Sequence, residues 1–87
     1  MTASYKILVK KSAEREVRAI PKPFLSKIVQ KIRSLSLEPR PTGCEALVGH
    51  DKGYRIRQND YRIVYVVNDP KKEVTIVKVG HRSDVYR

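Results

Sequence analysis

The sequence predicts an α+β domain that spans residues 1–87 and has the element order β-α-α-β-β-β, with a helix pair packed on one face of a mainly antiparallel sheet. Two patterns predict this class. Apolar residues recur at helical spacing between positions 13 and 35, and they alternate with polar residues on both sides of an Asn-Asp pair between positions 53 and 67. A chain of 87 residues has room for one compact core and no second domain.

The first half of the chain is expected to form a short strand and two antiparallel helices. Tyr5–Lys10 is a strand candidate, and Ser12 is expected to cap the first helix because its hydroxyl can accept an N–H of the first turn. Pro21 and Pro23 end this helix and begin the next, since proline disrupts a helix interior but suits a first turn. The apolar stripes of the two helices are Ala13, Val17 and Ile20, followed by Leu25, Ile28, Val29, Ile32 and Leu35.

An irregular stretch separates the helices from the remaining strands. Glu38–Gly43 is expected to be a loop because each of its two prolines disfavours helix at the residue before it, and Cys44–Lys52 has no sustained pattern beyond a possible short turn. Further on, Asp69–Lys72 is expected to be a turn, and the β-branched run Val74–Val79 is expected to be a central or well-covered strand.

Between these segments, Gly53–Tyr65 has the pattern of a β-hairpin whose two-residue loop is the Asn-Asp pair at positions 59 and 60, two residue types suited to positive φ. This loop would place Arg57 directly opposite Arg62, with Arg55 on the same face. Because like charges directly across a strand pair destabilise a sheet, the trio predicts either a plainly solvated surface or a site for a dense anion such as phosphate. The other face carries Tyr54, Ile56, Tyr61, Ile63, Tyr65 and Val67, which are expected in the core.

The charge balance points to an anionic partner. The formal net charge is +10, from 19 Lys and Arg against 9 Asp and Glu, and self-repulsion of this size destabilises a compact state unless a partner neutralises it. Nucleic acid or an acidic protein fits better than a membrane surface, because the basic residues are not gathered on one amphipathic helix. No signal peptide or membrane span is recognised, so a cytoplasmic location is expected, and the lone Cys44 agrees with a reducing compartment. No cofactor is expected, and His50 and His81 with this cysteine make a poor zinc site.

The residues after the last strand are rich in titratable groups, among them His81, Arg82 and Tyr86. Cleavage of RNA by attack of a ribose 2′-hydroxyl on the adjacent phosphate needs a base, positive charge for the phosphorane and an acid for the leaving oxygen. Arginine supplies the charge without a metal, and histidine suits the acid or base, whereas tyrosine needs neighbouring cations to lower its pKa. Ser83 and Asp84 are equally suited to capping a last helical turn. Composition and spacing predict a basic domain with an anion-binding sheet face and nothing sharper.

Two blocks of the sequence, Gly-Tyr-Arg-Ile-Arg…Asp-Tyr-Arg-Ile-Val-Tyr at Gly53–Tyr65 and Val-Gly-His-Arg-Ser-Asp-Val-Tyr at Val79–Tyr86, resemble the RelE/ParE toxin superfamily on its RelE side. The resemblance covers nearly the whole chain, although only these blocks are specific. It implies the toxin of a type II toxin-antitoxin system, a metal-independent endoribonuclease (mRNA interferase) that cuts mRNA in the ribosomal A site. It also implies a cognate acidic antitoxin, mRNA on the 70S ribosome as substrate, and contact with operator DNA only through the antitoxin complex.

By the same resemblance, Arg55 and Arg57 bind and orient the RNA, and we count Lys52 with them. Arg62 corresponds to a catalytic arginine after the turn, and Arg82 to an arginine implicated in stabilising the phosphate and the leaving group. Tyr86 corresponds to a tyrosine that stacks on or orients the mRNA.

This sequence departs from the best-known members at several of these positions. Arg55 and Arg57 stand where those members have lysines, so a general-base role does not carry over, since arginine stays protonated. His81 stands where those members have another basic residue, so it is expected either to take over acid–base work or to be incidental. The chain ends at Arg87 without the longer final helix of some members.

Two other classes of function stay open. One is a ParE-like inhibitor that poisons DNA gyrase by binding it, without catalysis. The other is a plain nucleic-acid-binding module, for which more exposed aromatic residues would be expected between the basic ones.

Overall fold

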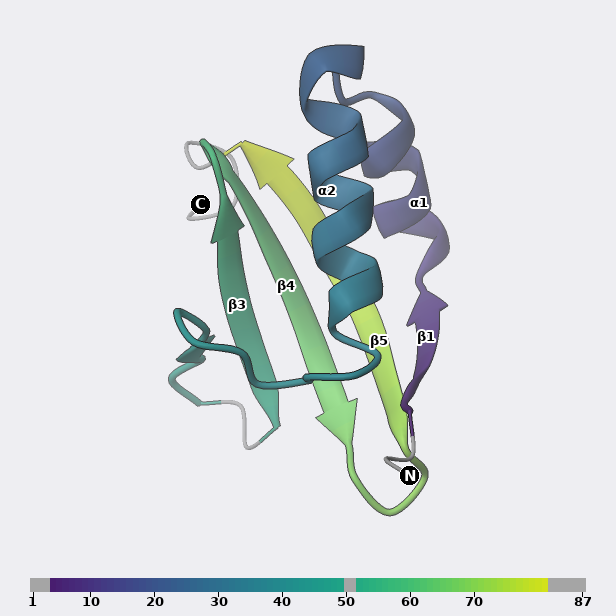
Figure 1. The fold of residues 1–87 in the computed structure, drawn as a ribbon, viewed down its shortest axis with the longest axis vertical. Coiled ribbons are helices and arrows are strands. Elements are labelled where there is room, and N and C mark those ends of the chain that lie inside the picture. Colours follow the sequence, from purple (N-terminus) through teal and green to yellow (C-terminus); the bar gives the residue numbers. More distant parts are fainter. Residues whose placement is uncertain (1–3, 50–51, 82–87) are drawn as a thin grey trace.

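The computed structural model describes residues 4–49 and 52–81. The described residues form two helices and five strands (Figure 1). In chain order these are β1 (Lys6–Val9), α1 (Lys11–Arg18), α2 (Lys22–Ser34), β2 (Glu45–Ala46), β3 (Gly53–Gln58), β4 (Tyr61–Asn68) and β5 (Glu73–His81). The α+β class is confirmed, with one short strand more than expected.

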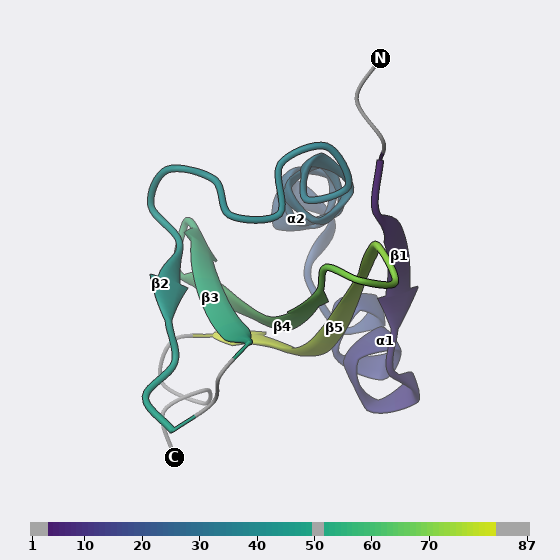
Figure 2. The ribbon, with the colours of Figure 1, turned by 90° about the horizontal axis from the view of Figure 1, so that it is seen from below.

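The five strands form a mixed sheet in the order β1-β5-β4-β3-β2. β1 runs parallel to β5, and every other neighbouring pair is antiparallel. Figure 1 shows the β3–β4 turn and the end of β5 at one end of the sheet, and the β4–β5 turn at the other end. Figure 2 shows α2 lying across one side of β3, β4 and β5. Within residues 4–49 and 52–81, no helix lies on the opposite side of β3 and β4.

The β3–β4 hairpin has the register that its sequence predicts. The paired residues are Gln58 and Tyr61, Arg57 and Arg62, Ile56 and Ile63, and Arg55 and Val64. The loop differs from expectation in one respect. Asn59 adopts φ = 58°, whereas Asp60 is not among the described residues with positive φ.

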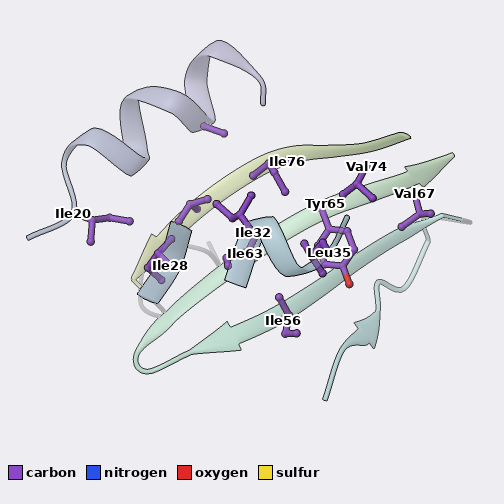
Figure 3. Close-up of a cluster of buried hydrophobic side chains, with 12 residues drawn as sticks. Ile20, Ile28, Ile32, Leu35, Ile56, Ile63, Tyr65, Val67, Val74 and Ile76 are labelled. Atoms are coloured by element: carbon purple, nitrogen blue, oxygen red, sulfur yellow. The ribbon is translucent and has the colours of Figure 1, made fainter. Parts of the chain in front are cut away.

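The core lies between the sheet and the two helices (Figure 3). The expected hairpin face supplies four of its buried residues, and each helix supplies part of its apolar stripe, because a helix and a sheet each bury one face against the other. Tyr54 and Tyr61 are only partly buried against this core. The buried residues are Ala13, Ile20, Ile28, Ile32, Leu35, Ile56, Ile63, Tyr65, Val67, Val74, Ile76 and Val79.

Three local features correct the sequence analysis. Ser12 lies inside α1 and is not its cap: the N-cap is Lys10, which makes no side-chain capping bond. The region predicted to be irregular contains β2, whose Glu45 and Ala46 pair with Arg55 and Tyr54. The last strand extends past its β-branched run to His81, because β4 offers pairing partners as far as the hairpin loop.

Candidate functional site

The side of the hairpin without a helix carries two arginines in direct opposition. Arg57 pairs with Arg62 across β3 and β4, and Arg62 in turn pairs with Gly80 of β5, which presents no side chain beside it. Arg57 is exposed, but Arg62 is only 7% exposed. This burial argues against the reading of the trio as a plainly solvated surface. The pair combines one solvent-facing cation with one that is withdrawn from water, where electrostatic interactions are stronger.

Arg55, the third member of the trio, is half-buried and lies two residues before Arg57 on β3. Its Nε donates to Oε1 of Glu45 at 3.1 Å, and Glu45 is also its direct cross-strand partner. Sequence reasoning missed Glu45 because a two-residue strand is too short to show an alternating pattern. Glu45 is therefore placed to fix the direction of the Arg55 guanidinium.

Lys52 does not join the arginines. It precedes β3, and its carbonyl accepts a hydrogen bond from the backbone N–H of Val67 at 3.0 Å. Five residues of extended strand separate it from Arg57, a distance of about 17 Å. Lys52 lies at the end of the hairpin away from its turn.

His81 lies on the other face of the sheet from Arg57 and Arg62. It pairs directly with Tyr61, and directly opposed side chains share a face. The imidazole meets the Tyr61 ring edge-on at 82°, with centroids 5.8 Å apart, and Tyr61 also contacts Phe24 of α2. His81 lines a hollow of about 260 Å³ with Glu16 of α1 and other residues of β4 and β5. The structure thus separates the imidazole from the arginine pair that it was expected to assist.

Arg82 and Tyr86, the remaining residues of the sequence-predicted site, lie outside the described residues.

A polar cluster at the opposite end of the sheet has a structural role that sequence reasoning also missed. Arg40 donates to both carboxylate oxygens of Asp69, at 2.8 and 3.3 Å, and its Nε donates to the Tyr54 hydroxyl at 2.8 Å. The Tyr5 hydroxyl donates to Asp69 at 2.7 Å. The hydrogen bonds from Arg40 and Tyr5 lower the pKa of Asp69 to about 2. This Asp69 cluster ties the loop after α2 and the segment before β1 to the β4–β5 turn.

Taken together, the arginine face can bind a compact anion and stabilise charge that develops on it. Arginine presents planar N–H donors that match phosphate, and it stays charged at neutral pH. It supplies no proton acceptor, so any proton transfer at this face requires another group.

Comparison with known proteins identifies relatives along nearly the whole chain. A family model described as the ParE toxin of the type II toxin-antitoxin system, parDE, matches residues 7–86. Toxin RelG of Mycobacterium tuberculosis is 29% identical over 84 residues, which cover 95% of this chain and 97% of that protein.

Solved structures share the fold. RelE in the archaeal RelE-RelB complex from Pyrococcus horikoshii superimposes with a TM-score of 0.81 at 28% identity, covering 97% of this chain and 99% of that one. The isolated RelE toxin of E. coli superimposes with a TM-score of 0.80 at 29% identity, covering 95% and 92% of the two chains.

Neither helix in the described part of the chain is long and apolar enough to cross a membrane.

Proposed function

The chain belongs to the ParE toxin family of type II toxin-antitoxin systems, and from this premise we propose that it is an endoribonuclease that cuts mRNA in the ribosomal A site. The relatives named RelG and RelE support placing it on the RelE side of the family. Action on translating ribosomes places it in the cytoplasm.

The observation that carries this proposal is the opposition of Arg57 and Arg62 on the side of the hairpin that faces away from α2. A direct like-charge pair weakens a hairpin by roughly 0.2–1 kcal/mol. A phosphate bound by both guanidiniums would replace this repulsion with attraction of each arginine to the anion. A site that stabilises a phosphorane needs this concentration of fixed positive charge.

In the proposed reaction, the ribose 2′-oxygen forms a bond to the adjacent phosphorus and the bond from phosphorus to the 5′-oxygen breaks. The 2′-proton passes to a base, and the leaving 5′-oxygen takes up a proton. Arg57 and Arg62 would stabilise the charge on the nonbridging oxygens, with Arg55 orienting the RNA. Arg82 is proposed to assist at the phosphate and leaving group, and Tyr86 to stack on a base. No metal is required by these roles.

The proton acceptor is assigned to a group other than the arginines. His81 lies on the opposite face, against Tyr61, so the geometry does not support it as the base. Tyr86 or a group of the ribosome is left to accept the 2′-proton.

We also propose a cognate acidic antitoxin as the partner that silences this surface. The net charge of +10 supports such a partner, as does the solved complex of a relative, RelE, with RelB. Operator DNA would be contacted only through that complex.

One observation favours a second function, because the matching family model is described as a ParE toxin. A ParE-like gyrase inhibitor would need no phosphate-handling site. Primer extension on mRNA from programmed ribosomes separates the two: discrete cuts in the A-site codon support the nuclease. Intact mRNA together with linearised plasmid in the presence of gyrase would instead establish the inhibitor.

A further inference from the structure

A second cationic surface lies on the helix side of the sheet, where α2 passes β3. Lys27, Lys31 and Ser34 recur at i, i+4 and i+7, so they form one stripe along α2 beside its buried face. Together with Gln30 and with Gln58 of β3, this stripe lines a hollow of about 310 Å³. The residues that line it carry ammonium, amide and hydroxyl groups.

A neighbouring hollow continues this surface toward the arginine pair. It has a volume of about 470 Å³ and is lined by Lys31, by loop residues 42–45, and by Ile56 and Arg57 of β3. Because Lys31 lines both hollows, and Arg57 and Gln58 are consecutive residues, we treat the two as one feature, the α2–β3 groove. Arg57 therefore borders the groove and also belongs to the arginine pair.

The edge of β3 leaves a route between the two faces. β2 is only two residues long and pairs with Tyr54 and Arg55. Among the described residues, no strand lies beyond β3 at Ile56–Gln58, next to the hairpin turn. An extended ligand bound at Arg57 on one face could thus pass round this edge into the groove.

The cations of the groove are not neutralised within the described part of the chain. Four ion pairs join described residues, and none of them includes Lys27, Lys31 or Arg57. Glu45 also lines the groove, but its carboxylate is held by Arg55. An anion that enters would meet the two lysines of α2, with Arg57 at the β3 edge, and would replace the repulsion between the lysines with attraction.

We infer that the α2–β3 groove binds backbone phosphates of single-stranded RNA next to the phosphate held at the arginine pair. This inference rests on the proposed function and extends its substrate site to neighbouring nucleotides. Lys27 and Lys31 are one helical turn apart, about 6 Å along the axis, a spacing that suits successive phosphates of an extended strand. Gln30, Ser34 and Gln58 supply uncharged groups of the kind that contact phosphate and sugar.

An acidic peptide added to the β3 edge is a different occupant, and the lining favours it less. Peptides that add a strand gain specificity from pockets for alternate side chains. Here the one apolar β3 side chain that lines the groove, Ile56, is 3% exposed and committed to the core.

The test measures binding of noncleavable 2′-O-methyl RNA to the full-length protein by fluorescence anisotropy over a salt series. The groove variant is Lys27→Gln with Lys31→Gln. Its control is Lys6→Gln with Lys71→Gln, which removes the same charge from β1 and the β4–β5 turn, at the other end of the sheet. Circular dichroism confirms that both variants fold.

For a decanucleotide, the groove variant should lower the slope of log affinity against log salt by about 1.4, from about 0.7 for each lost phosphate contact. The control should leave the slope at the wild-type value. For a dinucleotide, which engages only the arginine pair, neither variant should change the slope.

Equal slopes in the groove variant and the wild type would overturn the inference, and so would equal losses in the two double variants, which would mark general charge attraction. A decaglutamate peptide serves as the second probe. If the groove variant weakens its binding and spares the RNA, the groove is a peptide site. Primer extension with the wild-type protein distinguishes failure of this inference from failure of the proposed function. If the mRNA is cut but the groove variant keeps the wild-type salt slope, only the groove inference fails. If the mRNA stays intact, the proposed function itself fails.

Discussion

The arginine pair leads to a prediction in which two cross-strand partners, changed in the same way, behave differently. Arg57→Ala and Arg62→Ala are both expected to abolish most mRNA cleavage, because each removes a donor from the proposed phosphorane site. Removal of one such preorganised donor costs about 10²–10³ in rate in well-studied enzymes. Their effects on stability should diverge, because Arg57 is exposed and Arg62 is buried.

The size of the divergence follows from burial and register. Arg57→Ala removes a like charge from a direct cross-strand pair, so the stability should stay constant or rise by up to about 1 kcal/mol. Arg62→Ala deletes two buried methylenes as well as the guanidinium, which costs about 1.6 kcal/mol at about 0.8 kcal/mol for each methylene. Relief of the same like-charge pair offsets roughly 0.2–1 kcal/mol of this cost and leaves a net loss of about 0.6–1.4 kcal/mol. In a domain of this size, this net loss lowers Tm by roughly 2–11 °C.

The assay combines thermal unfolding followed by circular dichroism with primer extension on programmed ribosomes. Arg62→Met is the matched control, since it keeps an apolar stem without the charge: it should recover much of the lost Tm and remain inactive. Full cleavage activity in Arg57→Ala would remove the anion-site argument. An unchanged Tm in Arg62→Ala would show that this side chain is not packed in solution, and the contrast between the two arginines would fail.

Three further outcomes are expected. His81→Gln should leave the pH dependence of single-turnover cleavage unchanged, because the imidazole contacts Tyr61 on the other face; loss of an inflection near pH 6–7, the reference range of histidine, would return it to the mechanism. The Asp69 cluster should stabilise the fold above the ordinary carboxyl pKa, and this stabilisation should disappear as the pH falls toward about 2. In urea unfolding, Asp69→Asn should therefore lose less stability on acidification than the wild type and an Asp60→Asn control. Association with the antitoxin should be fast and should weaken steeply with salt, and harmless high-level expression of the free protein would contradict both the toxin and the partner.

Features that depend on local periodicity could be predicted from the sequence. The alternation of Ile56 with its arginine neighbours, and of Ile63 with Arg62, determined both the faces and the register of the hairpin, and the structure has that register. The two prolines between the helices likewise located their boundary, because proline restricts the backbone wherever it occurs.

Features that depend on long-range packing could not be predicted. Nothing local distinguishes the buried Arg62 from the exposed Arg57, since burial is set by the neighbours that the fold brings to each strand. The position of His81 was missed because the last strand was expected to end two residues earlier, at Val79. Once β5 runs to position 81, strict alternation from Val79 puts the imidazole on the core side.

The same alternation explains how a strained arginine pair can be kept in place. A slip of one residue between β3 and β4 would separate Arg57 from Arg62, but it would also turn the side chains of one strand to the opposite face. If β3 is the strand that turns, exposing its buried Ile56 would cost about 1.5–3 kcal/mol, against roughly 0.2–1 kcal/mol gained by parting the like charges. The core register therefore holds Arg57 and Arg62 at directly opposed backbone positions on one face, so a bound phosphate would not have to bring the two strands into this pairing.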